Sequence, residues 1–430
     1  MSAAERREQI IAAAREVFVE QGVTGARSRQ IAERAGITEA YLYRHFHSKD
    51  ELYRLAVDAP LKTMLDQVES EVNRLAERDD VSRTEVLFHC HSLLLGSTVE
   101  IAPLLAAAMF SDPEPGREFY LDNLLPTFRA VVESIIPAIT GWPLKAFEVD
   151  VFAQSLLGIH LGIAFDSLLD ETTIDVSNVA RQVTVMFAQS MLAERDRTSA
   201  RSRGNAKPTP GAKTRPRSSP KGTTDHQPLT RKRLPAAERR VKIIEAARDA
   251  FLHGSMNGAR TKDIADRAGV TEAFLYRYFD SKEAMYEAAV LEPLREAIAA
   301  LADDLAALND EVDDPIEFVR QVHRRCLEFF VNYARLQSIA LFAEIGSGRE
   351  FYAEAVKAHL DRLGYVLAKH TGWDVRGIDP VVVRRCALGA QFIVGLDHGF
   401  RQDAIDLDFL ANELTVLFTG GIKEKPSVVR

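Results

Sequence analysis

The run His89-Cys90-His91 carries the side chains most able to bind a metal ion, because imidazole and thiolate are both zinc ligands. Alternate residues on a helix point in different directions, so one helix cannot present both imidazoles to one ion. The three cysteines, Cys90, Cys326 and Cys386, are odd in number and far apart, which fits neither a disulfide framework nor a zinc site. We therefore expect no metal site, no disulfide, and a protein of the reducing cytoplasm.

Enzyme chemistry would need a nucleophile with its base, a Gly-rich phosphate loop or a metal motif such as HExxH. The sequence contains none of these arrangements. We expect no enzyme activity and no cofactor, and a hydrolysis screen would separate an enzyme from the other classes considered below.

A stretch near the N-terminus favours a different chemistry, the reading of base edges by a helix. The pattern predicts a short amphipathic helix over 28–35 that ends at Gly36, where a left-handed residue is expected. Thr38 can cap a second helix over 39–46 through its hydroxyl group, and Ser48-Lys49-Asp50-Glu51 has the sequence of a capping box that opens another helix. A helix, a tight turn and a second helix form the unit whose second helix enters the major groove of DNA.

The same pattern returns later in the chain. Helices are predicted over 261–268 and 272–279, separated by a turn at Gly269. Ser281 is followed by Ala284 where the first copy has a glutamate, so the reciprocal half of the capping box is missing.

The repetition extends beyond this motif. Residues recur at a spacing of 231 to 233 positions, among them Gly36 as Gly269, Lys49 as Lys282, Gly116-Arg117-Glu118-Phe119-Tyr120 as Gly348-Arg349-Glu350-Phe351-Tyr352, and Gly141-Trp142 as Gly372-Trp373. A period this long indicates duplication of a complete unit rather than a solenoid of short repeats.

The composition changes between the two copies. From 194 to 233 the chain is rich in Pro, Gly, Ser, Thr, Lys and Arg, which predicts a flexible linker, with a basic arm on DNA phosphates as the alternative. Elsewhere apolar residues recur with helical spacing and hairpin patterns are absent, so we expect an all-α fold. The predicted domains are two helix-turn-helix domains (1–55 and 234–288), two helical ligand-binding and dimerisation domains (56–193 and 289–423), and the flexible basic linker (194–233).

The first motif, Ile31-Ala32-Glu33-Arg34-Ala35-Gly36-Ile37-Thr38 with Leu42-Tyr43-Arg44-His45-Phe46-His47-Ser48-Lys49, resembles the N-terminal signature of the TetR family, and so does 264–282. The close resemblance covers about 50 residues in each copy. It implies two tandem TetR-like units, each a helix-turn-helix domain followed by a helical ligand-binding and dimerisation domain. We expect the two units to dock on each other as a pseudo-dimer within one chain.

The resemblance also implies roles for the matching positions. Tyr43 and Tyr276 would hold phosphate through their hydroxyls, and Lys49 and Lys282 would hold it by charge. The side chains that face the groove would be Arg29, Glu39, Ala40, Tyr41 and His45 in the first copy, and Lys262, Glu272, Ala273, Phe274 and Tyr278 in the second. The remaining members of the expected DNA-binding set are Ser28, Thr38, Thr261 and Thr271.

Aromatic, Met and His side chains inside apolar helical segments form a second candidate site, because such residues can line an apolar pocket with a few polar groups. The alternative for each of them is ordinary core packing. The candidates are Phe88, His91, Met109, Phe119, Tyr120, His323, Phe330, Phe342, Phe351 and Tyr352.

Two apolar helices are predicted at the end of each copy, over 149–169 with 176–191 and over 381–400 with 407–418. The resemblance implies that they form the four-helix dimer interface of the family. The glycines that would let these helices approach closely are Gly158, Gly162, Gly389 and Gly395.

The formal net charge of −8 argues mildly against nucleic-acid binding, yet basic residues concentrate near the two motifs and in the linker. A non-specific architectural DNA protein would need broad positive charge, and competition with bulk DNA would identify one. No stretch approaches the roughly 18 uncharged apolar residues of a membrane span, and the N-terminus has no signal-peptide pattern, so no membrane partner is expected.

Together these observations predict a transcription regulator that binds a double-stranded DNA operator. One chain would read both half-sites of an imperfect palindrome, and a small apolar effector would release it. Repression is the expected direction; activation, and the association of more than one chain with one operator, are the alternatives.

Overall fold

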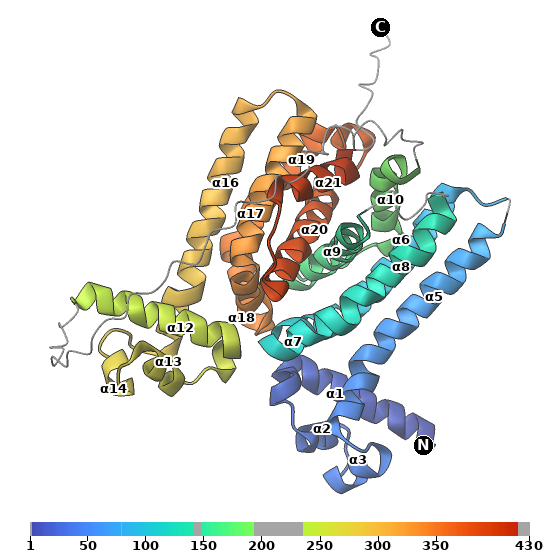
Figure 1. The fold of residues 1–430 in the computed structure, drawn as a ribbon. Coiled ribbons are helices and arrows are strands. Elements are labelled where there is room, and N and C mark those ends of the chain that lie inside the picture. Colours follow the sequence, from blue (N-terminus) through green and yellow to red (C-terminus); the bar gives the residue numbers. More distant parts are fainter. Residues whose placement is uncertain (1, 79, 141–147, 193–234, 420–430) are drawn as a thin grey trace, which may run out of the picture.

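The computed structural model describes residues 2–78, 80–140, 148–192 and 235–419, and these residues form helices and turns without any strand (Figure 1). The all-α prediction is thereby confirmed. The predicted linker over 194–233 lies outside the described residues, as do Gly141 and Trp142 of the repeated motif.

The first repeat begins with a helical head and continues into a helical body. The first head contains α1 (Ala3–Gly25), α2 (Ser28–Arg34), α3 (Glu39–His45) and α4 (Lys49–Tyr53). The first body contains the π-helical turn η1 (Arg54–Asp58), α5 (Ala59–Ala76), α6 (Arg83–Phe110), α7 (Pro113–Phe119), η2 (Tyr120–Leu124), α8 (Leu125–Thr140), α9 (Val149–Leu169) and α10 (Val176–Leu192).

The second repeat follows the same order of elements. The second head contains α12 (Ala236–Gly258), α13 (Thr261–Ala268), α14 (Glu272–Leu275) and α15 (Lys282–Tyr286). The second body contains η4 (Glu287–Leu291), α16 (Glu292–Glu311), α17 (Pro315–Phe342), α18 (Ile345–Phe351), η5 (Tyr352–Val356), α19 (Lys357–Thr371), η6 (Asp374–Arg376), α20 (Pro380–Arg401) and α21 (Leu407–Thr419). The π-helical turns lie at equivalent places in the two repeats.

The first head folds around the apolar face that the helical spacing predicts. Ile10 of α1, Ile31 of α2, Leu42 of α3 and Phe46 are fully buried. Gly36, between α2 and α3, has a φ of 66°, the left-handed conformation predicted for the turn. Burial of one face of α3 leaves its opposite face directed outward.

The helix caps follow the predictions with corrections. Thr38 Oγ1 accepts the Tyr41 N–H at 3.2 Å and Ser48 Oγ accepts the Glu51 N–H at 3.0 Å, as predicted. The prediction of the reciprocal half of the capping box at Ser48 is wrong. The Glu51 carboxylate accepts the N–H of His47 at 2.7 Å, one residue before Ser48.

Helix α14 of the second head, predicted over 272–279, is also shorter than predicted. It ends at Leu275, and the next residues form a turn in which the Tyr278 N–H donates to the Leu275 carbonyl at 2.9 Å. Thr271 precedes it without a side-chain cap, unlike Thr38. Two successive i→i+3 hydrogen bonds, from the Arg277 N–H to Phe274 and from the Tyr278 N–H to Leu275, replace the α-helical pattern at this end.

Two helices of the first body, α6 and α9, are long and apolar enough to cross a membrane by length and composition. Their most apolar windows are 61% and 78% buried inside the described fold. Burial of this kind is typical of core helices, which pass the same test as membrane spans.

The two bodies pack on each other chiefly through α9 and α20, which lie near the centre of the molecule (Figure 1). The backbones of these helices approach closely at glycines. A Cβ atom on Gly158 would lie 2.4 Å from the carbonyl oxygen of Gly389, and one on Gly162 would lie 2.5 Å from that of Arg385. Gly395 differs from the prediction, because its neighbour is Phe330 of the same body, at 2.6 Å. The crossing therefore depends on Gly158, Gly162 and Gly389.

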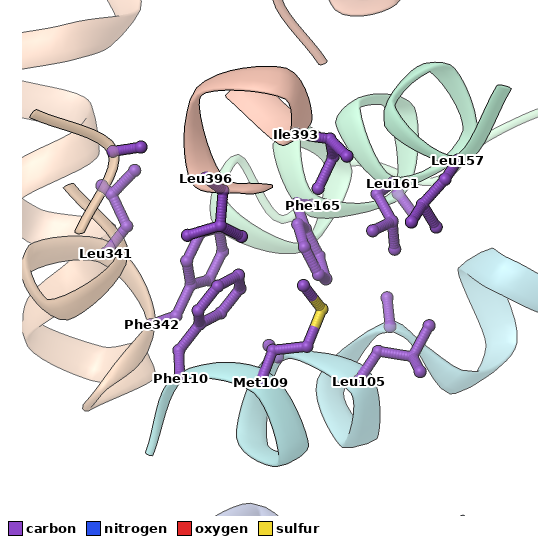
Figure 2. Close-up of a cluster of buried hydrophobic side chains, with 14 of the residues drawn as sticks. Leu105, Met109, Phe110, Leu157, Leu161, Phe165, Leu341, Phe342, Ile393 and Leu396 are labelled. Carbon is purple, nitrogen blue, oxygen red and sulfur yellow. The ribbon is translucent and has the colours of Figure 1, made fainter. Parts of the chain in front are cut away.

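Equivalent residues of the two repeats meet along this interface. The rings of Phe110 and Phe342 stack at 4.9 Å, and Phe165 packs on Phe342 at 4.8 Å (Figure 2). The rings of Phe187 and Phe418 meet edge to face at 5.2 Å. In a two-fold arrangement, residues on the axis contact their own equivalents. The interface between the repeats thus has approximate two-fold symmetry.

Candidate DNA interface and effector cavity

The outward face of α3 gathers most of the groove-facing residues predicted in the first head. Tyr41 and Tyr43 are 36% and 44% exposed, and Glu39 and Ala40 are exposed beside them. Large aromatic side chains that remain open to solvent on a short helix are available for contacts with a partner. The equivalent Tyr276 of the second head is 48% exposed.

A second group of polar side chains meets at the start of α2. Tyr43 and Ser28 share a hydrogen bond of 2.7 Å between their hydroxyls. The Lys49 ammonium, carried on the first turn of α4, donates to the carbonyl of Ala26 at 3.2 Å. Hydroxyl and ammonium groups converging on one surface can donate to a phosphate oxygen.

The second head keeps part of this arrangement. The Lys282 ammonium donates to the carbonyl of Ala259 at 3.4 Å, the equivalent contact. Thr261 differs from Ser28, because its hydroxyl donates to the Glu272 carboxylate at 2.9 Å. The lysine contact is thus the same in both heads. The hydroxyl at the start of the second helix binds Tyr43 in the first head and Glu272 in the second.

An aromatic pair four residues apart occurs in each head, on α3 in the first and at α14 and the turn after it in the second. The rings of Tyr41 and His45 are 5.0 Å apart, and those of Phe274 and Tyr278 are 5.4 Å apart. The second pair survives the early end of α14, since Tyr278 lies in the turn that follows. Polar side-chain atoms are present on Tyr41, His45 and Tyr278, whereas Phe274 has none.

Arg29 and Lys262 project from the helices that precede these turns. The Arg29 guanidinium pairs with Glu33 at 2.8 Å, and this hydrogen bond raises the pKa of Arg29. Both partners are well exposed, so the pair is weak and can be exchanged for another acceptor. Lys262 is exposed at the equivalent position.

Two arginines that the sequence analysis did not single out also shape the heads. Arg7 lies over the ring of Phe46 at 4.7 Å, and Arg240 lies over Phe279 at 5.2 Å. These cation–π contacts join the first helix of each head to the end of its recognition segment. The recurrence of Ala4-Glu5-Arg6-Arg7 as Ala237-Glu238-Arg239-Arg240 is the sequence signal that could have identified them.

The predicted effector residues lie in several different places. Phe88 is half-buried beneath Arg181, and Phe351 is buried beneath Arg295. Phe119 and Met109 are fully packed. These four are core or edge residues in the described fold.

The two predicted histidines are buried in equivalent polar pairs. His91 Nδ1 and His160 Nε2 share a hydrogen bond of 3.3 Å, whereas the Gln391 amide donates to His323 Nδ1 at 2.5 Å. Burial lowers the pKa of His160 to about 4 and that of His323 to about 3, and it also lowers the pKa of His91. All three are neutral at pH 7. Among the described residues no cluster of possible metal ligands is found.

The second body contains an apolar cavity between α16, α17 and α19, which spans about 670 Å³ of space, a volume that includes open solvent. We call it the second-body cavity. Its wall includes Ile298, Leu301, Leu305, Phe330, Leu360, Leu363 and Val366.

A second cavity of about 570 Å³ lies against α9 of the first body, between α17 and α20, and we call it the inter-repeat cavity. Phe330, Phe342 and Tyr352 of the predicted effector set line one or both of these cavities. The aliphatic residues of α16 and α19 that form most of the wall were not predicted, because aliphatic residues at helical spacing are the common pattern of any core.

Tyr120, the equivalent of Tyr352, lies beside Asp397 at the other side of the interface. Burial and the neighbouring Asp397 carboxylate raise the pKa of Tyr120. Near it, the Arg117 guanidinium donates to the carbonyl of Phe400 at 2.9 Å. Tyr120 thus belongs to the contact between the repeats.

Comparison with known proteins gives two matches to one family model, described as bacterial regulatory proteins, tetR family, at residues 10–56 and 243–289. These segments are the two heads. A solved TetR-like transcriptional regulator from Rhodococcus sp. RHA1 is 23% identical, covers 45% of this chain and 100% of that chain, and has a TM-score of 0.35.

Similar curated proteins are transcription regulators. The activator FasR of Mycolicibacterium smegmatis is 53% identical over 49 residues, 11% of this chain and 22% of FasR. The repressor KstR2 of Rhodococcus jostii is 32% identical over 92 residues, 20% of this chain and 45% of KstR2. The regulator PksA of Bacillus subtilis is 34% identical over 191 residues, 44% of this chain and 91% of PksA. The chain thus spans less than half the length of the first two relatives and most of the third.

Proposed function

This chain belongs to the tetR family of bacterial regulatory proteins, in a form that carries the family's N-terminal unit twice, and from that premise we propose that it is a sequence-specific DNA-binding transcription regulator. Its heads, 1–55 and 234–288, would be the DNA-binding domains. The bodies, 56–193 and 289–423, would sense an effector and hold the heads in register.

Each recognition segment is proposed to enter a major groove with its outward face. In the first head, the phosphates of one DNA strand would be bound by Tyr43, Ser28 and Lys49. In the second head they would be bound by Tyr276 and Lys282. The exposure of these tyrosines and the convergence of hydroxyl and ammonium groups at the start of α2 support this role. Arg29 and the outward residues of α3 would then reach base edges.

The observation that carries the proposal of one chain on one operator is the approximate two-fold symmetry of the repeat interface. The Phe110–Phe342 and Phe187–Phe418 pairs join equivalent positions of the two repeats. Two-fold symmetric regulators read two related half-sites, one with each head. The chain would supply by itself the pair of heads that a homodimer assembles from two chains.

The second-body cavity is the proposed effector site. It is lined mainly by apolar side chains and opens partly to solvent, as small-molecule sites commonly do. We propose a cytoplasmic repressor that leaves its operator when a small apolar molecule enters this cavity. The named relatives include an activator and a repressor, so the direction of regulation is measured separately below.

Selection from a random DNA library with the full-length protein tests the proposal. We expect a bipartite motif with two related arms, confirmed by footprinting upstream of neighbouring genes. Transcription from that promoter with and without the protein gives the direction. Failure to enrich any motif against bulk competitor DNA would reject a sequence-specific reader.

The two heads differ where Arg29 of the first corresponds to Lys262 of the second. An arginine can grip guanine with two hydrogen bonds, whereas lysine is a point charge. We therefore expect the arm under the first head to be the more stringent, and the double exchange of Arg29→Lys with Lys262→Arg to move that stringency to the other arm. A perfect palindrome that the exchange leaves unchanged would refute this asymmetry.

A further inference from the structure

The second-body cavity and the inter-repeat cavity are direct neighbours. They share the wall residues Phe330, Gln337, Val356, Leu360 and Leu388. We call the combined space the joint cavity. It runs from the apolar region between α16 and α19 to the surface of α9 in the first repeat.

The two ends of the joint cavity differ in chemistry. The end between α16 and α19 is lined mostly by aliphatic side chains such as Leu301, Leu305 and Leu363, and His359 and Arg362 of α19 also line it. The end at the repeat interface includes Asp166, Tyr352, Arg384 and Arg385. A ligand that fills the whole space must have an apolar body and a polar end.

The polar end contains more buried positive charge than buried negative charge. Asp166 accepts from Arg384 Nη1 at 2.6 Å, from Arg385 Nε at 2.5 Å and from the Tyr352 hydroxyl. The side chains of Arg384 and Arg385 are 2% and 9% exposed, so one buried carboxylate serves two buried guanidinium groups. A second carboxylate, Asp361, lies 3.1 Å from Arg384 but is 47% exposed and therefore screened by water.

Hydrogen-bonding capacity is also left over at this end. Arg384 Nε and Gln337 Oε1 are buried and have no hydrogen-bond partner within the described part of the chain. Burial alone would raise the pKa of Asp166, but the guanidinium groups of Arg384 and Arg385 lower it, so the carboxylate stays charged. An anionic acceptor would satisfy the Arg384 Nε–H donor, whereas Gln337 Oε1 is an acceptor and would need a donor group.

The first repeat lacks the same constellation. Its positions equivalent to Arg384, Arg385 and Gln337 are Ala153, Gln154 and Leu105, respectively 231, 231 and 232 positions earlier. Asp397, equivalent to Asp166, instead pairs with Arg401 of its own helix at 2.9 Å.

The cavity wall differs in the same way. Leu360 of the second body corresponds to Phe128, whose larger ring is 1% exposed in the first body. The polar end with two arginines therefore exists on one side of the approximate two-fold axis, and residues of both repeats form it.

We propose that the joint cavity binds one amphipathic anion per chain, with its apolar body between α16, α17 and α19 and its anionic end at Arg384 and Arg385. This inference rests on the proposed function, because it names the effector class of the same regulator. The anion competes with Asp166 for the arginines. Binding thus loosens a contact between the repeats and changes how the two heads are held on the operator.

Calorimetric titration of the full-length protein with decanoate, decan-1-ol and decylammonium tests the effector class without DNA. We expect one decanoate per chain, bound at least tenfold more tightly than decan-1-ol, with decylammonium weakest. Equal affinity for the three compounds, two decanoates per chain, or no binding of decanoate would each overturn the proposal.

Matched variants test the location. Arg385→Gln, which introduces the residue of the first repeat, should reduce decanoate affinity to that of decan-1-ol and leave decan-1-ol unchanged. Arg401→Gln, on the opposite side of the approximate axis, should leave both affinities unchanged. Leu360→Phe should weaken both compounds. An equal loss of decanoate in Arg385→Gln and Arg401→Gln would refute the polar end.

Operator binding separates this inference from the proposed function. Each variant is first checked for wild-type operator affinity in the absence of ligand and for a cooperative melting transition. Wild-type protein that binds its operator and ignores decanoate would overturn the effector class alone. Wild-type protein that binds decanoate but enriches no DNA motif would overturn the proposed function alone.

Discussion

At the scale of single residues, Lys49 and Lys282 occupy equivalent places, each donating its ammonium to a main-chain carbonyl in front of the second helix of its head. If they hold phosphates, replacing either with Ala should weaken binding to every DNA sequence by a similar factor. The slope of log affinity against log salt should fall by about one, because one fewer counterion is released. Operator affinity measured across a salt series checks this.

Glu77 provides the control for this experiment, since it is an exposed charged residue at the end of α5 in the first body. Glu77→Ala should leave the salt slope unchanged. An altered base preference in Lys49→Ala with undiminished affinity would refute the phosphate role.

His160 gives a residue-scale prediction on stability. Burial lowers its pKa from the ordinary 6.5 to about 4, so between these values the unfolded chain binds a proton that the folded chain does not. The free energy of unfolding therefore falls as the pH falls through this window. His160→Gln, which copies Gln391 of the second repeat, should reduce this dependence by about 1.4 kcal/mol per pH unit.

Urea unfolding between pH 4.5 and 7 measures that slope. His47→Gln is the control, because His47 is already exposed to solvent in the folded chain, so that unfolding changes its surroundings little. The same slope in wild type and His160→Gln would mean that His160 is not the group that takes up the proton.

At the scale of helices, the crossing of α9 and α20 is set by glycines. A Cβ atom on Gly158 would lie 2.4 Å from the Gly389 carbonyl oxygen, and neither backbone can yield without separating the helices. We expect Gly158→Ala to destabilise the chain by about 1–3 kcal/mol, although alanine favours a helix more than glycine does.

Gly96 in the middle of α6 is the matched control. Its nearest neighbour would lie 3.7 Å from an added Cβ, an ordinary contact. Gly96→Ala should therefore be neutral or stabilising by up to about 1 kcal/mol. Thermal unfolding of both variants checks the contrast, and a stabilised Gly158→Ala variant would show that the helices do not cross so closely.

At the scale of the whole molecule, the two repeats pack on each other within one chain, chiefly through α9 and α20. The α9 and α20 helices bury their close-packed faces on each other, and Phe187 meets Phe418 nearby. We expect the free protein to be monomeric, with a mass near 47.9 kDa by light scattering. A stable mass of twice that value would show that the repeats pair between chains.

The heads were predictable because their determinants are local. Gly36 in the left-handed turn, Thr38 as a cap and the buried face of Leu42 and Phe46 depend on neighbours within a few residues. Even in the heads, some hydrogen-bond partners and one helix end were predicted wrongly. Glu51 accepts from His47 instead of Ser48, and α14 ends early, since several donors or acceptors lie within reach at helix ends.

The duplicated all-α architecture could be predicted from features visible in the sequence. These features are the repeat spacing, the helical periodicity and the glycines of α9 and α20. The lining of the two cavities did not follow from composition, because aromatic residues line cores and cavities alike. Only the tertiary structure brings Asp166 to Arg384 and Arg385, more than 200 positions away, or stacks Phe110 on Phe342. Such contacts depend on where two helices cross, and that crossing is decided by packing of the whole interface rather than by any local pattern.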